Sequence, residues 1–102
     1  MKLDKIMKQA QQMQSKMAQV QEALAKETVT GQAGGGMVTV TANGHGDIVS
    51  LSIEKEVVDP ADVEMLEDLV LAAVTDAVRK SRELAQERMN SVTGGLASLG
   101  MM

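Results

Sequence analysis

The central segment of this 102-residue chain reads GGGMVTVTANGHGDIVSLSI (residues 34–53), and it predicts a β-hairpin. Apolar and hydroxyl side chains alternate along residues 38–42 and again along residues 49–53, which is the period-two pattern of strands that bury one face. Between the two runs, Asn43-Gly44 favours a tight reversal, and a glycine two residues later leaves room for a longer loop or a bulge. Because an isolated hairpin is only marginally stable in water, its apolar face must be covered by the flanking segments.

The N-terminal segment is expected to form a long helix. Apolar residues recur at alternating steps of three and four from Leu3 to Leu24, which is the a/d spacing of a coiled coil, and no glycine or proline occurs before Gly31. A helix of about 25 residues is about 38 Å long, whereas a compact domain of about 100 residues has a radius of gyration of about 13 Å. The helix should therefore project as an arm or pair with a second long helix.

A weaker strand candidate lies at residues 27–32, and a second long helix is expected after the hairpin. Asp59-Pro60 offers an N-cap acceptor followed by proline at the first helical position, with Asp62 placed as in a capping box. Apolar residues then recur at helical spacing over residues 63–92, with acidic side chains in the first turns and basic ones later, which suits the helix dipole. The acidic cluster is interpreted as this dipole complement and a solvated face, not as a metal or acid/base site.

The C-terminal end of the second helix is predicted from glycine. Gly94-Gly95 is expected to stop the helix. The expected fold is α+β, with a long helix, a three-stranded antiparallel sheet and a second long helix, in the order α-β-β-β-α. Residues 1–93 are expected to form one domain and residues 94–102 a flexible C-terminal tail.

The composition favours an oligomer. The chain has no aromatic residue, and aromatic side chains are the largest single contributors of buried area, so its core is thin for its length. The candidate residues for the core or for a dimer interface are apolar residues of the hairpin and the second helix: Val38, Val40, Val49, Leu51, Ile53, Leu66, Leu69, Val70 and Ala73.

Little in the sequence supports catalysis. There is no cysteine, and the one histidine, His45, lies between two glycines at the expected hairpin tip, where it is interpreted as an exposed turn residue. The Gly34–Gly36 run lacks the Lys-Ser/Thr of a phosphate-binding loop and is interpreted as a reversal or a close backbone approach. We therefore expect no enzymatic activity, no catalytic or metal site, no cofactor and no small-molecule substrate. No run reaches membrane-spanning length, so a soluble intracellular protein without a membrane partner is expected.

Four segments in this order resemble the YbaB/EbfC family of bacterial nucleoid-associated proteins: MKQAQQMQ (residues 7–14), GGMVTVTANG (35–44), LEDLVLAAVTDA (66–77) and TGGL (93–96). The resemblance runs over nearly the whole chain. It implies a homodimer whose long helices protrude as arms that embrace DNA. It also implies a non-enzymatic role in nucleoid organisation, with possible regulation of gene expression, in the cytoplasm at the nucleoid.

Charge is distributed unevenly along the chain. The formal net charge is −4, so a DNA-binding surface must carry the basic side chains while the acidic surface faces away. The candidate DNA-binding residues are basic residues of the two long helices: Lys2, Lys5, Lys8, Lys16, Arg79, Lys80, Arg82 and Arg88. Because no aromatic side chain can stack on bases, duplex DNA with weak sequence preference is favoured over single strands. The alternative is a helical protein-interaction adaptor or chaperone-like module that grips a partner helix without binding DNA.

Overall fold

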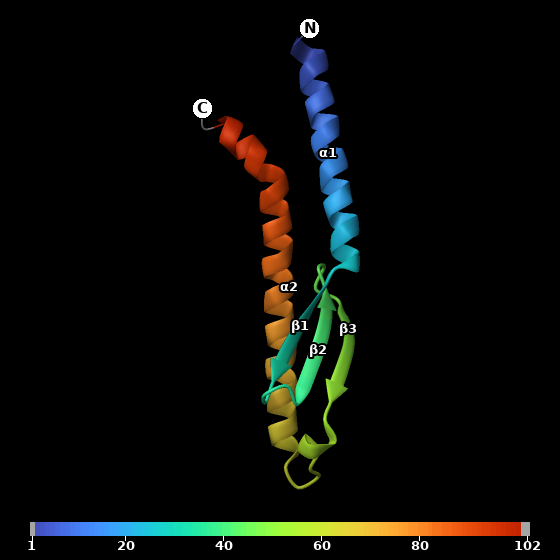
Figure 1. Ribbon diagram of the computed structural model, residues 1–102, viewed down its shortest axis with the longest axis vertical. Helices are drawn as coiled ribbons and strands as arrows, with labels where there is room; N and C mark the ends of the chain where they lie inside the picture. Colours follow the sequence, from blue (N-terminus) through green and yellow to red (C-terminus); the bar gives the residue numbers. More distant parts are fainter. Residues whose placement is uncertain (1, 101–102) are drawn as a thin grey trace.

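The computed structural model describes residues 2–100, with side chains described for residues 2–92. The molecule is elongated, with extents of 73 × 24 × 16 Å and a radius of gyration of 19.9 Å, well above the roughly 13 Å of a compact domain of this length. Figure 1 shows why: two helices rise beyond one end of a small sheet. The expected α-β-β-β-α order is confirmed.

The elements follow one another with short connections. They are α1 (Lys2–Lys26), β1 (Thr28–Ala33), β2 (Val38–Asn43), β3 (Ile48–Ile53), the short 3-10 helix η1 (Lys55–Val57) and α2 (Val63–Gly100). The three strands form an antiparallel sheet in the order β1-β2-β3. The β1–β2 turn uses Gly34, Gly35 and Gly36 at positive φ, so the glycine run is a reversal.

The hairpin between β2 and β3 is looser than the tight reversal expected at Asn43-Gly44. Only Gly46 has a positive φ in this turn, and the Asn43 side chain holds the loop instead, because its Oδ1 accepts hydrogen bonds from the backbone N–H groups of His45 and Asp47. A bulge follows, since Ala42 pairs with Ile48 and Thr41 with Ser50. Val49 is the extra residue, which is the bulge that the loop glycine allowed for.

Both expected ends of α2 were wrong. Asp59 begins a turn, in which its Oδ1 accepts from Ala61 N–H and its carbonyl accepts from Asp62 N–H. The helix therefore starts at Val63, and Asp62 is its cap, with Oδ1 accepting from Met65 N–H at 3.2 Å. At the other end α2 continues to Gly100, because a glycine inside a helix costs only about 1 kcal/mol and need not end it. The flexibility of residues 94–102 stays a prediction.

The core lies between α2 and the first two strands. Val38, Val40 and Ala42 of β2 pack against Ala73 and Ala77 of α2, and all five are fully buried. The helix can approach this closely because β1 has Gly31 opposite it, where a Cβ atom would overlap Ala77 N and Ala73 O. Four of the candidate core residues pack against this cluster while partly exposed: Ile53, Leu66, Leu69 and Val70.

The third strand is left uncovered. Leu51 pairs with the buried Val40, so its side chain lies on the helix-facing side of the sheet, yet it is 49% exposed. Its neighbours Ile48 and Val49 are 46% and 59% exposed. The reason is geometric: α2 lies across β1 and β2 and does not extend over β3.

The outer edge of β1, in contrast, is capped by side chains of α2. Lys80 Nζ donates a hydrogen bond to the Thr30 carbonyl at 2.9 Å, and Asp76 Oδ2 accepts one from Gln32 N–H at 3.1 Å. These are the backbone groups that an additional strand would use. In the part of the chain that the structure describes, no side chain does the same for β3, so one edge of the sheet is partly capped and the other is open.

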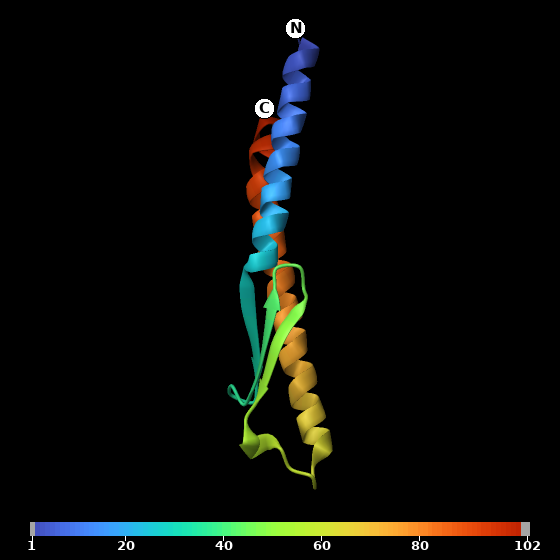
Figure 2. The same ribbon diagram turned by 90° about the vertical axis from the view of Figure 1, so that its right-hand side faces the viewer.

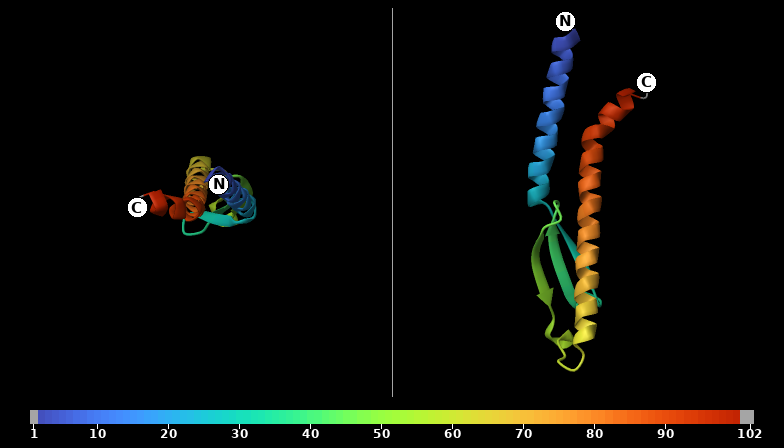
Figure 3. Two further views of the ribbon diagram at one scale, coloured as in Figure 1. Left: turned by 90° about the horizontal axis from the view of Figure 1, so that it is seen from above. Right: turned by 180° about the vertical axis from the view of Figure 1, so that it is seen from behind.

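The two arms leave the sheet together. α1 and the C-terminal half of α2 run side by side in opposite chain directions beyond the β2–β3 turn, and the outer parts diverge (Figures 2 and 3). Along α1, only Leu24 near the sheet is buried, while Leu3 and Ile6 are 66% and 60% exposed. The apolar seam of α1 is therefore mostly without a partner helix within the described chain.

Candidate nucleic-acid interface

The basic side chains of α1 lie free on its surface. Lys2, Lys5, Lys8 and Lys16 are exposed, and within residues 2–92 none of them makes an ion pair or hydrogen bond. A shallow groove of about 260 Å³ on this helix is lined by Lys5, Lys8, Gln9 and Gln12. Ammonium groups suited to phosphate and amide groups suited to base edges or sugars thus share one face of the arm.

The basic side chains of α2 are arranged differently. Arg79 binds Asp76 at 2.7 Å and Glu83 at 2.8 Å, and Lys80 binds Asp76 at 3.2 Å. These contacts hold the pKa of Asp76 down at about 2, with the Arg79 hydrogen bond as the largest cause and the Gln32 N–H bond next, and they raise the pKa of Arg79. Both cations lie beside the sheet, not on the projecting arm, and their charge is locally compensated.

Arg88 and Arg82 complete the candidate set. The Arg88 guanidinium forms a two-point contact with the Glu27 carboxylate, with Nη2 to Oε1 at 2.6 Å and Nε to Oε2 at 3.1 Å. Arg82 is exposed and has no ion-pair partner among the described side chains. Beyond Arg88, residues 89–102 contain no charged residue at all. The cationic arm is therefore α1, and the projecting end of α2 is neutral.

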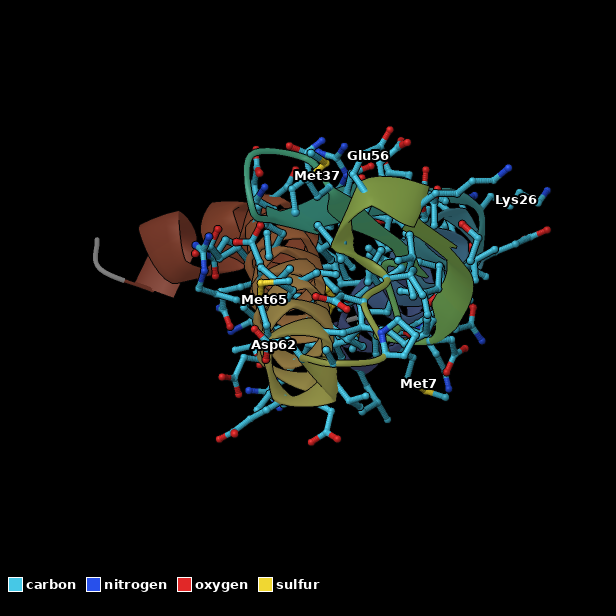
Figure 4. The ribbon with its side chains drawn as sticks, turned by 90° about the horizontal axis from the view of Figure 1, so that it is seen from below. Met7, Lys26, Met37, Glu56, Asp62 and Met65 are labelled. Atoms are coloured by element: carbon cyan, nitrogen blue, oxygen red, sulfur yellow. The ribbon has the colours of Figure 1, made fainter. Side chains whose placement is uncertain are left out.

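The opposite end of the molecule is acidic. Asp59, Asp62, Glu64, Glu67 and Asp68 gather in the turn before α2 and in its first turns, and all are exposed. Figure 4 looks at this end from below and shows Asp62 and Met65 at the start of α2, with Glu56 across from them near η1. Net charge is thus separated along the 73 Å axis: lysines outnumber Asp4 and Glu22 on α1, and carboxylates outnumber Lys55 at the base.

No chemical site accompanies this separation. His45 is exposed, as expected, but its Nε2 lies 2.9 Å from the Gln21 carbonyl of α1, a contact that its position in the sequence did not indicate. Across the described residues, His, Asp and Glu side chains form no group able to hold a metal ion. The same residues include no helix with the length and apolarity needed to span a bilayer.

The model of the YbaB/EbfC DNA-binding family matches residues 1–96. The chain belongs to the YbaB/EbfC DNA-binding family. Membership of this family makes it a DNA-binding protein and not an enzyme, in agreement with the expectation from the sequence.

Relatives cover nearly the full chain. A nucleoid-associated protein of Chloroflexus aurantiacus is 56% identical over 94 residues, covering 92% of this chain and 94% of its own length. A nucleoid-associated protein of Acetivibrio thermocellus is 50% identical over 97 residues, covering 95% and 86%. The crystal structure of uncharacterized protein HP0035 from Helicobacter pylori superposes with a TM-score of 0.74 at 26% identity, covering 94% of this YbaB/EbfC chain and 98% of that one.

Proposed function

We propose that this protein binds double-stranded DNA as a homodimer with weak sequence preference, organising the nucleoid and regulating gene expression without catalysis. The observation that carries the proposal is the row of uncompensated lysines on α1, the arm farthest from the acidic base. Phosphate contacts by lysine release counterions and provide affinity without reading sequence. The names of the relatives, nucleoid-associated proteins, support the same role.

The acidic base orients the molecule on DNA. With a net charge of −4 per chain, a duplex is repelled on average, and only an approach from the arm side is attractive. Absence of aromatic side chains removes the stacking platforms used for single strands, which favours duplex. Binding should accordingly be weak in sequence preference and steep in salt dependence.

A second copy is proposed to occupy the open side of the sheet. Ala73 and Ala77 mark the sheet-facing line of α2, and successive helical residues are about 100° apart. Asp76 and Lys80 lie one residue before Ala77 and Ser81, and their side chains reach the β1 edge. Val74 and Val78 lie one residue after Ala73 and Ala77, so they lie on the other side of α2, towards β3.

Both this flank and β3 expose apolar side chains: Leu71 of α2 is 67% exposed, and Ile48, Val49 and Leu51 of β3 are exposed as well. A groove of about 570 Å³ on the flank is lined by Val74 and Val78 together with the polar residues Thr75, Arg79, Arg82 and Glu83. Large exposed apolar side chains on neighbouring elements favour an interaction site. A homodimer would supply the apolar cover that a chain without aromatic residues lacks.

The dimer is tested by a pair of substitutions on the two faces of β3. Leu51→Glu places a charge on the apolar surface and should shift the protein to monomer in light scattering. Ser50→Glu adds the same charge to the opposite face, since Ser50 pairs with Thr41, and should leave the mass unchanged. Equal masses for both variants and the wild type would contradict the proposed interface.

DNA binding is tested by titrating a duplex of about 30 base pairs with the wild-type protein at several salt concentrations. The logarithm of the binding constant should fall linearly with the logarithm of salt concentration, with a slope of about −0.9 for each phosphate contact. No binding at low salt would overturn the proposal.

The exposed seam of α1 favours one alternative, an adaptor that grips a partner helix. Leu3, Ile6 and Met17 are 66%, 60% and 37% exposed, which suits a helix-in-groove contact. Substituting Leu3 and Ile6 by Gln separates the two functions: duplex affinity is retained if DNA is the ligand of α1, and an adaptor would lose its partner.

A further inference from the structure

An ion pair joins the two helices near the sheet end of α1. Glu27 is the residue that joins α1 to β1, and Arg88 lies on α2 opposite it, 61 positions later in the chain. Their two-point contact, at 2.6 and 3.1 Å, has the geometry that gives arginine–carboxylate pairs their directional strength. A pocket of about 300 Å³ lies beside it, between Val20 and Ala23 of α1 and Val92 of α2.

This pair differs in kind from the other ion pairs within residues 2–92. Those formed by Asp76, Arg79, Lys80 and Glu83 connect residues three or four apart on α2. Asp76 and Lys80 also bind the β1 edge, but these pairs do not connect α2 to α1. Glu27–Arg88 joins two different elements. The hydrogen bond from Arg88 lowers the pKa of Glu27 below its ordinary value.

The direction of α1 is determined almost entirely at its sheet end. Besides the ion pair, the contacts there are the buried Leu24 side chain, the 2.8 Å bond from Gly44 N–H to the Leu24 carbonyl, and the bond between the His45 ring and the Gln21 carbonyl. Farther from the sheet, the side chains of α1 are mostly exposed. Because it is a rod about 38 Å long, a rotation of about 10° at its root moves the far end by roughly 6 Å.

We propose that Glu27 and Arg88 are positioning residues, whose contact sets the angle between α1 and α2 and so places the α1 lysines against the DNA backbone. Arg88 is then not a phosphate contact, because its guanidinium is engaged by Glu27. Glu27 favours DNA binding even though it is acidic. This inference rests on the proposed function of the α1 lysines.

Removing the carboxylate charge separates positioning from simple electrostatics. Glu27→Gln deletes a negative charge, which by charge alone should tighten duplex binding. Loss of the positioning contact should instead weaken it about fivefold. Glu22→Gln is the matched control: Glu22 is exposed on α1 with no partner among the described side chains, and its neutralisation should leave affinity equal or higher.

The angle between the arms can be measured directly. The chain has no cysteine, so cysteines placed at the exposed Gln11 and Asn90 take spin labels without background, and mixing with excess unlabelled protein leaves mainly distances within one chain. The wild-type background should give a narrow distance distribution and Glu27→Gln a broad one. The exchange Glu27→Arg with Arg88→Glu should restore both the narrow distribution and the affinity, with circular dichroism confirming that all variants are folded.

The outcomes distinguish the two levels of the proposal. An unchanged distance distribution in Glu27→Gln would overturn the positioning role whatever the affinity. A broadened distribution with affinity as high as that of Glu22→Gln would overturn its connection to DNA. Failure of the wild type itself to bind duplex, with the same broadening in Glu27→Gln, would overturn the proposed function and support the positioning role alone.

Discussion

The two arms of this protein are both helical but differ in charge. α1 carries Lys2, Lys5, Lys8 and Lys16 without ion-pair partners among the described residues, whereas residues 89–102, the end of α2, contain no charge. The cations of α2 lie earlier: Arg79 and Lys80 bind Asp76, Lys80 also caps the edge of β1, and Arg88 binds Glu27. Arg82 alone among them has no ion-pair partner within the described side chains. The basic residues of the two helices therefore have different roles, because a cation that is paired with a carboxylate is less available to bind a phosphate.

The largest expected effect comes from removing the charge of α1. Replacing Lys2, Lys5, Lys8 and Lys16 by Gln should lower duplex affinity at about 0.1 M salt by at least about 100-fold and flatten the salt dependence, because each lost phosphate contact reduces the slope by about 0.9. The measurement is a fluorescence anisotropy titration. Replacing Arg79 and Lys80 by Gln is the control and should change affinity by less than about threefold. Equal losses of duplex affinity in both variants would show that the α1 lysines contribute no more to DNA binding than Arg79 and Lys80 do.

A smaller effect is expected from giving charge to the neutral arm. Asn90→Lys adds a cation to the exposed surface of α2 beyond Arg88 and should raise duplex affinity about fivefold, with a steeper salt dependence. Asn90→Glu should lower it by a similar factor. If neither variant departs from the wild type, the end of α2 lies away from DNA and α1 alone forms the interface.

The smallest effect on DNA binding is expected from the Asp76 cluster, which should matter for stability instead. The pKa of Asp76 is lowered from 3.8 to about 2, so its contribution is complete above about pH 4 and is lost as the pH falls towards 2. Asp76→Asn should therefore have a lower urea midpoint than the wild type at pH 7 and the same midpoint near pH 2. Asp68→Asn, on an exposed position without a partner in the described chain, should follow the wild type throughout. Duplex affinity should be unchanged in both.

Local patterns in the sequence predicted most of the fold. The heptad spacing of α1 and the alternation in β2 and β3 reflect periodicities that each element needs by itself, so their bounds agree with the structure within one or two residues. The ends of α2 were wrong because they depend on competing local contacts. Asp59 is used by a turn, which leaves the cap to Asp62, and the glycine pair near the C-terminus does not outweigh the helix around it.

The candidate interface was predicted only as a set of cations. The sequence did not show which of these cations are paired with a carboxylate. The three- and four-residue spacings from Asp76 and Glu83 to Arg79 and Lys80 are nevertheless the ones that form ion pairs on a helix. The Glu27–Arg88 contact has no such signal, because 61 residues separate the two side chains and only the fold brings them together. The exposure of β3 could not be predicted from the sequence either, because its alternation of apolar and polar residues is the same as that of the buried β2.

One consequence of the capped β1 edge concerns how far assembly can proceed. Lys80 and Asp76 of the same chain occupy the outer Thr30 carbonyl and Gln32 N–H, so an incoming strand would find two of the backbone groups on that side already bound. If two copies meet through the apolar side of β3, as proposed above, each buries the same patch of its surface and the two-fold arrangement is closed. In such a dimer, the partly occupied β1 edge would also disfavour growth by addition of further strands.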